Sequence, residues 1–254
     1  MDLAERISTL RRVNGLSARQ LAALVDVAPT TVTRIEAGQV SPSFDLAQEI
    51  LAVLGEPIGF TGEADVAAIA AARLALDPTS ADLAAVPGID VWRQRWARIG
   101  LVDKVGRAVV GREAELLLRA GRAARLTRRS GSVDFEPGSG AQEVAVALGR
   151  KHLDYALTGD AGANAYLSSA GEAWPVLYVE DVVRSASAAK LVRKEPGSFG
   201  LRITLIPFDG VSEVGRKKID GITVASRDQV VIDAYGGVDR MPEQADLLLG
   251  RRVA

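Results

Sequence analysis

The chain has 254 residues, which is more than one small domain needs, so two or three domains are expected. Its 48% hydrophobic residues suffice for well-packed cores, the net charge is −1, and the absence of cysteine excludes disulfides and thiolate chemistry. No apolar run reaches the roughly 18 residues of a membrane span, and the N-terminal stretch does not resemble a leader peptide. We therefore expect a cytoplasmic protein with no membrane partner.

The first part of the chain has helical periodicity with clear start and stop signals. Apolar residues at helical spacing predict a first helix over residues 2–13. Ser17 and Gln20 have the spacing of a capping box, which predicts the start of a short second helix. Ser41-Pro-Ser43 opens a further helix after the one described next.

A helix over residues 28–37 is the segment predicted to contact another molecule. Pro29 suits the first helical turn, and Gly38 can adopt the left-handed conformation that ends a helix. At about 100° per residue, Val32 and Ile35 fall on one side of this helix. The opposite side carries short polar residues and one cation: Thr30, Thr33 and Arg34.

This arrangement resembles the lambda-repressor-like (XRE-type) helix-turn-helix. The matching motifs are Leu16-Ser-x-x-Gln-Leu-Ala22, Val32-x-x-Ile-Glu-x-Gly38 and Pro42-x-x-x-Leu-x-x-x-Ile50. The resemblance implies a double-stranded DNA operator whose major groove receives the helix at 28–37. The residues expected at the DNA are Thr30, Thr31, Thr33, Arg34, Arg19, Gln20 and Ser43, the last beside amides that would bind phosphate.

Two further points follow from this resemblance. Glu36 is expected to pair with Arg11 of the first helix and to stabilise the fold without contacting DNA. Pro29 departs from the family, in which a polar base-reading residue is common at that position. The alternative is an amphipathic helical bundle that has no DNA partner.

Residues 61–131 are predicted to form a basic block of their own. A linker at 61–63 leads into an Ala-rich helix over 65–76, a short second helix, and a third helix over 89–99. Two short strands are expected around Val105-Gly106, and three helices followed by a hairpin is the order of a winged helix. In that fold a second set of DNA contacts would be Arg93, Gln94, Arg95, Arg98, Lys104 and Arg107.

The charge of this block is uneven compared with that of the first helices. Residues 92–130 hold eleven Lys/Arg and three Asp/Glu, whereas residues 1–60 hold five and seven. Part of any phosphate affinity is therefore expected from the middle of the chain. The alternatives are a solvated face or a docking surface for an acidic partner.

The third helix of this block carries two tryptophans. Ile89, Trp92, Trp96 and Ile99 share one of its faces, so we interpret the tryptophans as core residues and not as base-stacking platforms. A further helix over 113–126 carries exposed arginines, and the domain boundary is placed at residue 131.

From residue 132 the pattern changes to alternating strands and helices, which predicts an α/β domain with a mixed sheet. The predicted strands are 132–135, 154–157, 175–179, 199–206 and 221–224; the predicted helices are 141–150, 161–169, 181–190, 226–234 and 242–251. The fold class is thus multi-domain: an all-α helix-turn-helix domain over 1–60, a helical or winged-helix-like domain over 61–131, and an α/β domain over 132–254.

Three phrases in the last domain resemble the C-terminal domain of AbiEi-family antitoxins from type IV toxin–antitoxin systems. They are Tyr155-Ala-Leu-Thr-Gly-Asp-Ala-Gly-Ala163, Ile203-Thr-Leu-Ile-Pro-Phe-Asp209 and Ile219-Asp-Gly-Ile-Thr-Val-Ala-Ser-Arg-Asp-Gln-Val-Val-Ile-Asp233. The resemblance implies an antitoxin that represses its own operon, paired with a nucleotidyltransferase-like toxin. That family usually begins with a winged helix, so the preceding helix-turn-helix is a departure.

Enzymatic chemistry finds little support in the sequence. His152 is the single histidine and is expected to be solvated. The turn Leu157-Thr-Gly-Asp160 is similar to the one that opens a nucleotidyltransferase site, but those enzymes need an Asp-x-Asp pair on the next strand. Here Glu180 and Asp181 are adjacent and point to opposite faces. We expect no enzyme, no catalytic residue, no cofactor and no metal.

The sequence therefore predicts a sequence-specific DNA-binding transcriptional regulator, in its finer form an autorepressing antitoxin that binds its operator as a homodimer. One alternative is an XRE-type repressor that senses a ligand and has no toxin partner. The alternative of another class is a nucleotidyltransferase-like enzyme.

Overall fold

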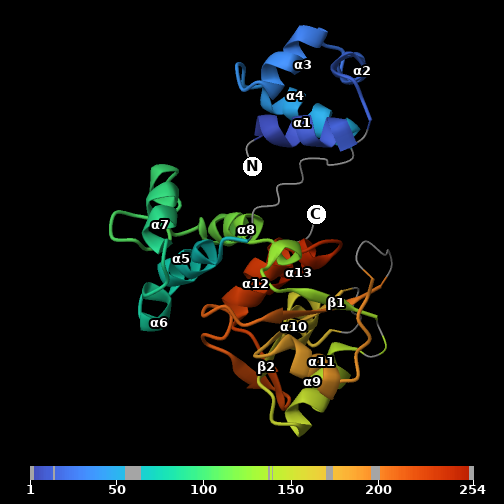
Figure 1. Ribbon diagram of the computed structural model, residues 1–254. Coiled ribbons are helices and arrows are strands. Elements are labelled where there is room, and N and C mark those ends of the chain that lie inside the picture. Colours follow the sequence, from blue (N-terminus) through green and yellow to red (C-terminus); the bar gives the residue numbers. More distant parts are fainter. Residues whose placement is uncertain are drawn as a thin grey trace. The chain divides into compact units, whose positions relative to one another are not determined.

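The computed structural model describes residues 3–13, 15–54, 64–136, 138, 140–169, 174–195 and 201–251. The chain divides into two compact units, Met1–Gly62 and Glu63–Ala254, and each is described by itself (Figure 1). Three predicted features fall at least partly outside the described residues: the linker at 61–63, the turn that contains Pro137 and Ser139, and the first residues of the strand predicted at 199–206.

The first unit is a bundle of short helices. Its described residues form α1 (Leu3–Val13), α2 (Ala18–Leu24), α3 (Pro29–Glu36) and α4 (Phe44–Val53). The core consists of buried residues from all four helices, among them Ile7, Leu21, Val32, Ile35 and Ile50. The predicted capping box is confirmed, because the Gln20 amide donates to Ser17 Oγ and the Ser17 amide donates to Gln20 Oε1, over 3.2 and 2.8 Å.

The second unit contains a mixed six-stranded sheet with the order β1-β4-β3-β2-β6-β5. The strands are β1 (Val133–Phe135), β2 (Tyr155–Thr158), β3 (Pro175–Val179), β4 (Ile203–Pro207), β5 (Lys217–Ile219) and β6 (Ile222–Val224). Neighbours β3 and β4 are parallel, as are β2 and β6, whereas the other pairs are antiparallel. The predicted mixed sheet is thus confirmed, with β5 as a strand that the sequence pattern missed.

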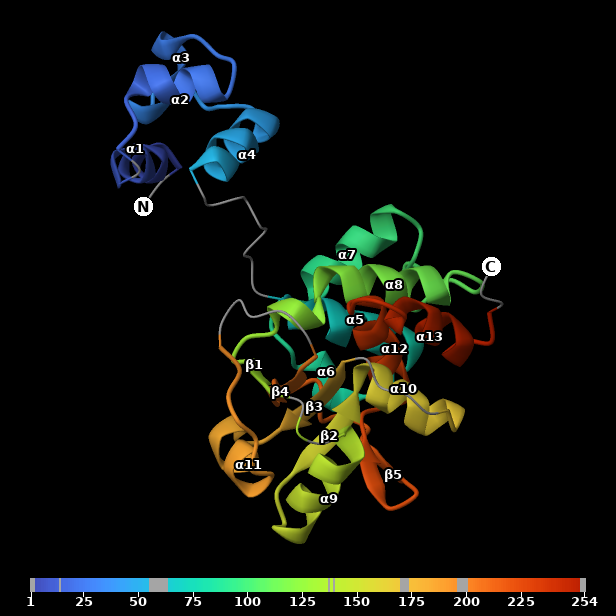
Figure 2. The ribbon, with the colours of Figure 1, turned by 90° about the vertical axis from the view of Figure 1, so that its right-hand side faces the viewer.

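Helices cover both faces of this sheet (Figure 2). They are α9 (Ala141–Arg150), α10 (Gly159–Leu167), α11 (Val182–Ala188), α12 (Arg227–Tyr235) and α13 (Met241–Leu248). Tyr155 of β2 faces Gly149 of α9, whereas Thr158 of the same strand bonds to Asp233 of α12. Because side chains alternate along a strand, α9 and α12 lie on opposite faces. Both faces of β2 and β3 are buried, which explains their continuous apolar runs.

A helical layer precedes the sheet and shares its core. It consists of α5 (Val66–Leu76), α6 (Ala81–Ala84), α7 (Ile89–Arg98), α8 (Glu113–Ala123) and the 3-10 turn η1 (Leu126–Arg128). Helix α5 is buried along most of its length and packs against α7, α8 and α12. A helix that is apolar on all sides must be covered on all sides. Residues on both sides of position 131 share one core and lie in one compact unit, and the domain boundary at 131 stays a prediction.

The predicted strands around Val105-Gly106 are replaced by a tight turn. One isolated antiparallel bridge joins Val102 to Ala108. The Asp103 carboxylate accepts hydrogen bonds from the amides of Val105 and Arg107, at 3.0 and 2.8 Å, and the Ala108 amide donates to Ala75 of α5. These contacts occupy the groups that a longer hairpin would use. The winged-helix assignment of this block stays a prediction.

None of the described helices is both long and apolar enough to cross a bilayer.

Candidate DNA-binding surface

Helix α3 separates an apolar side from a polar one. It begins at Pro29 after an extended Ala28, and Gly38 follows it with a positive φ of 67°. The left-handed conformation at Gly38 favours glycine and ends the helix. Val32 and Ile35 are 0% and 1% exposed, so this side of α3 is packed in the core of the first unit.

The opposite side of α3 presents the predicted contact residues to solvent. Thr30, Thr33 and Arg34 are exposed, and Thr31 is half-buried. The Thr33 hydroxyl donates to the Thr30 carbonyl over 3.0 Å, which fixes the side chain and leaves its oxygen as an acceptor. Arg34 has no hydrogen bond or ion pair with the part of the chain that the structure describes, so its guanidinium is available to a phosphate or a base edge.

The other predicted contacts surround α3 but have structural partners as well. Arg19, Gln20 and Ser43 are exposed. Gln20 is already half of the capping box of α2. Ser43 Oγ accepts from the Leu46 amide over 3.3 Å and so caps α4. These roles leave the Gln20 side-chain amide group as a remaining donor.

The orientation of α3 is held by the predicted ion pair. Arg11 of α1 binds both carboxylate oxygens of Glu36, at 2.6 and 2.8 Å, and also donates to the Leu16 carbonyl. Both side chains are largely buried. The hydrogen bond to Glu36 raises the pKa of Arg11, so this cation stays charged. The pair joins two helices of the bundle and keeps the threonine side of α3 outward.

The second predicted set of DNA contacts lies on α7 and the turn after it, and only some of its residues are exposed without side-chain partners among the described residues of the unit. Gln94, Arg98, Lys104 and Arg107 are exposed, as the DNA-binding prediction requires. Arg93 is half-buried, lies 3.5 Å from Asp90, and packs its guanidinium against Gly106. Arg95 lies over the ring of Trp92, 4.8 Å from its centroid. Arg93 and Arg95 therefore have roles within the unit that were not predicted.

The tryptophan-bearing face of α7 was predicted to lie in the core, and this prediction is correct only in part. Ile89 and Trp96 are buried, with Trp96 2% exposed. Trp92 is half-buried, and its indole N–H donates to Asp65 over 2.7 Å. Ile99 is 48% exposed, because α7 ends at Arg98 and the chain turns away before this side chain reaches the core.

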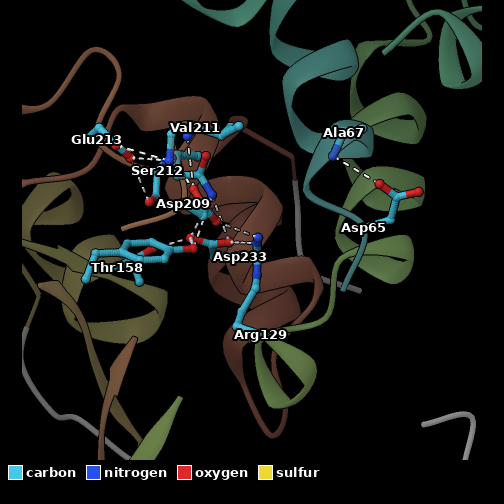
Figure 3. Close-up of polar contacts among 12 residues, drawn as sticks. Asp65, Ala67, Arg129, Thr158, Asp209, Val211, Ser212, Glu213 and Asp233 are labelled. Atoms are coloured by element: carbon cyan, nitrogen blue, oxygen red, sulfur yellow. Dashed lines mark hydrogen bonds and ion pairs between the residues drawn. The ribbon is translucent and has the colours of Figure 1, made fainter. Parts of the chain in front are cut away.

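The second unit contains a fully buried carboxylate, Asp233, near the end of α12 (Figure 3). Its carboxylate accepts hydrogen bonds from Arg129 at 2.7 Å, Thr158 at 2.6 Å and Tyr178 at 2.9 Å. Gln229, one turn earlier, donates to it over 3.1 Å. These partners are Arg129, which directly follows η1, one residue each from β2 and β3, and one from α12, so the cluster joins the sheet to the helices.

The Asp233 cluster continues into the helical layer through Arg73 of α5, which binds Gln229 and the carbonyl oxygens of Val211 and Val214. Burial raises the pKa of Asp233, and the charge of Arg129 opposes that shift. Burial also raises the pKa of Tyr178 well above its ordinary value. Arg129 Nε is buried without a hydrogen-bond partner among the described residues. All hydrogen bonds to the Asp233 carboxylate come from within the protein, so we interpret the cluster as a structural connection. Its members are spread from 73 to 233, so no local pattern pointed to it.

The turn that was compared with a nucleotidyltransferase site is closed. Thr158 and Asp160 are buried, and a Cβ at Gly159 would meet side chains of Met241, Val176 and Leu126 within 3.6 Å. Asp181 accepts from the Arg184 amide and caps α11. His152 lies exposed on the surface, as predicted.

The first unit is thus a helix-turn-helix that presents a polar helix face. Residues 7–60 match a protein-family model described as helix-turn-helix, in agreement with the XRE-type motifs and with a DNA-binding transcriptional regulator. Comparisons with curated proteins and with solved structures gave no match. The resemblance of the α/β domain to AbiEi-family antitoxins stays a prediction.

Proposed function

We propose that the chain is a sequence-specific transcriptional regulator that reads its operator with α3. The observation that carries the proposal is the exposed face of Thr30, Thr33 and Arg34 on a helix whose other side is anchored in the core of a helix-turn-helix unit. A homodimer would present two such helices about 34–36 Å apart, one turn of DNA. We therefore expect a pseudo-palindromic operator.

The finer proposal is an autorepressing antitoxin with a nucleotidyltransferase-like toxin as its counterpart. Its support is the resemblance of three phrases to AbiEi-family antitoxins. These phrases supply β2 with α10, β4, and β6 with α12. Thr158 of β2 and Gln229 of α12 both bond to Asp233. Co-expression with the toxin-like product of a neighbouring gene, scored as rescue of growth, tests this proposal separately from DNA binding. Absence of rescue favours the ligand-sensing repressor.

The experiment on DNA binding uses the full chain and operators selected from random duplex DNA. Arg34→Ala should weaken binding to the selected sequence by about 1–3 kcal/mol and relax preference at one base pair. The matched control is Arg12→Ala, an exposed arginine on α1 with the same change in charge. Fluorescence anisotropy gives the affinities and circular dichroism verifies the fold. Unchanged affinity and preference for Arg34→Ala would contradict the role of α3.

A further inference from the structure

A groove between α7 and α8 combines an apolar floor with a basic rim. Its volume is about 330 Å³, and residues of both helices line it. Its main apolar residues are Trp92, Trp96 and Ile99. Its basic residues are Arg95 from α7 and Arg119 and Arg122 from α8.

The apolar part of the groove is only partly used by the core. Ile99 leaves 48% of its surface in solvent, and Trp92 is half-buried. Trp92 and Trp96 lie with ring centroids 5.4 Å apart, and the hydrogen bond from Trp92 to Asp65 fixes the floor in place. A rigid, exposed apolar surface rimmed by charge is typical of a site for another macromolecule.

The rim carries more positive charge than the protein neutralises. Arg119 is bound by Glu115, but that carboxylate is shared with Arg112. Arg95 lies over Trp92, and Arg122 has no ion pair with any residue that the structure describes. An occupant with carboxylates beside an apolar side chain would therefore match both parts of the groove.

Of the predicted DNA contacts on α7, Arg95 lines this groove, whereas Gln94 and Arg98 do not. Steps of about 100° per residue place Arg95 and Ile99 about 40° apart, with Gln94 about 100–140° and Arg98 about 60–100° from them. Both pairs are exposed. The groove can thus be occupied without covering Gln94 and Arg98.

Single-stranded nucleic acid is a poorer match to the floor. Bases stack on open aromatic faces. Here Trp96 is 2% exposed, and Arg95 covers one face of Trp92. The accessible apolar surface is mainly the aliphatic side chain of Ile99 and the remaining part of Trp92, which suits an aliphatic side chain better than a base.

We propose that the groove between α7 and α8 binds an acidic amphipathic helix of a partner protein. One aliphatic side chain packs on Trp92 and Ile99, and carboxylates pair with Arg95 and Arg122. Docking of an amphipathic helix into an apolar groove is a common mode of peptide recognition. The proposal rests on the second unit alone and is independent of the operator contacts of α3.

The test measures fluorescence anisotropy of labelled peptides with the full chain. One probe is a designed helix with leucine along one side and glutamate along its flanks, and the second has lysine in place of each glutamate. The acidic helix should bind saturably and the basic one should not. Ile99→Asp and Arg122→Glu should each weaken binding by about tenfold or more, as expected for central contacts. The matched control is Arg98→Glu, an exposed arginine of α7 that does not line the groove.

All three substituted residues are exposed, and circular dichroism verifies that the variants fold. Equal loss of binding in Arg98→Glu would reduce the interaction to general charge attraction and overturn the proposal. Absence of saturable binding of the acidic helix would also overturn it. If a short single-stranded DNA bound more tightly than the acidic helix, and Arg122→Glu abolished that binding, the occupant of the groove would be a nucleic acid and the proposed protein partner would be wrong. Operator binding by α3 is read from Arg34→Ala and distinguishes failure of one proposal from failure of the other.

Discussion

Two arginines connect segments that are far apart in the sequence. Arg11 pairs with Glu36 inside the helix-turn-helix, and Arg129 pairs with Asp233 inside the α/β unit. Each cation is largely or fully buried, so each pair depends on hydrogen bonds that replace those lost from water. At these positions a single side chain controls how two elements meet.

Arg129→Met should leave the Asp233 carboxylate buried without its cation. We expect the free energy of unfolding of the second unit to fall by about 3–5 kcal/mol, as is typical when one partner of a buried pair is removed. Urea unfolding followed by circular dichroism measures the change. The matched control is the neighbouring Arg128→Met, whose side chain is only half-buried and should cost about 0.5 kcal/mol or less. Equal effects would contradict a special role for Arg129.

The loss in the free energy of unfolding caused by Arg129→Met should also depend on pH. Burial raises the pKa of Asp233 and Arg129 opposes that shift, so the variant raises it further. A carboxyl group with a raised pKa in the folded state contributes stability below its unfolded pKa, and this contribution is lost as the pH rises through the folded value. The deficit relative to wild type should therefore be smaller at about pH 5 than at about pH 8. A deficit that grows toward acid would contradict this linkage.

At the scale of elements, α8 and α12 pack so closely that their backbones meet. A Cβ at Gly121 would lie 2.4 Å from the Ile232 carbonyl oxygen and 2.8 Å from the Gly236 amide nitrogen. The absence of a side chain at Gly121 allows the two backbones to meet. This approach joins the helical layer to the helix that carries Asp233.

Gly121→Ala should force α8 away from α12 and lower the free energy of unfolding by about 1–3 kcal/mol, the usual cost of overpacking. Gly149→Ala is the matched control, because Gly149 is also helical but its Cβ would meet only Tyr155, at 3.9 Å. That substitution should stabilise the protein by up to about 1 kcal/mol through helix propensity. Urea unfolding of both variants checks the prediction, and the same sign for both would contradict it.

At the scale of the whole molecule, charge is distributed unevenly between the DNA-reading helices and the middle of the chain. Residues 1–60 hold more acidic than basic residues, whereas residues 92–130 hold eleven Lys/Arg against three Asp/Glu. A reader domain without excess positive charge makes few phosphate contacts on its own. Gln94, Arg98, Lys104 and Arg107 are the exposed residues that could add them.

The combined variant Arg98→Ala, Lys104→Ala and Arg107→Ala tests this division of roles. If the middle block binds phosphate, the slope of log affinity against log salt should become less steep by about one per lost contact, with base preference unchanged. Arg34→Ala should instead change base preference. Operator titrations over a range of salt concentrations measure both quantities. An unchanged slope in the combined variant would assign the exposed cations a role other than DNA binding.

A feature could be predicted from the sequence when it depends on residues that are close together along the chain. Val32, Ile35 and the Ser17–Gln20 capping box follow rules that involve residues at most four positions apart, and all of them are as predicted. The alternation of strands and helices likewise predicted a mixed sheet. The Arg11–Glu36 pair joins two helices, and its prediction relied on the resemblance to a known fold.

The tertiary structure alone decided the features that join distant segments. The burial of Asp233 by Arg129 and Thr158, the shared core across residue 131, and the groove beside Ile99 all depend on which elements pack together. A sequence pattern shows that a helix has an apolar side, but it does not identify the element that covers that side. Local hydrogen bonding and periodicity therefore determined helix α3 and its polar face, whereas long-range packing determined how the rest of the protein surrounds its buried charges.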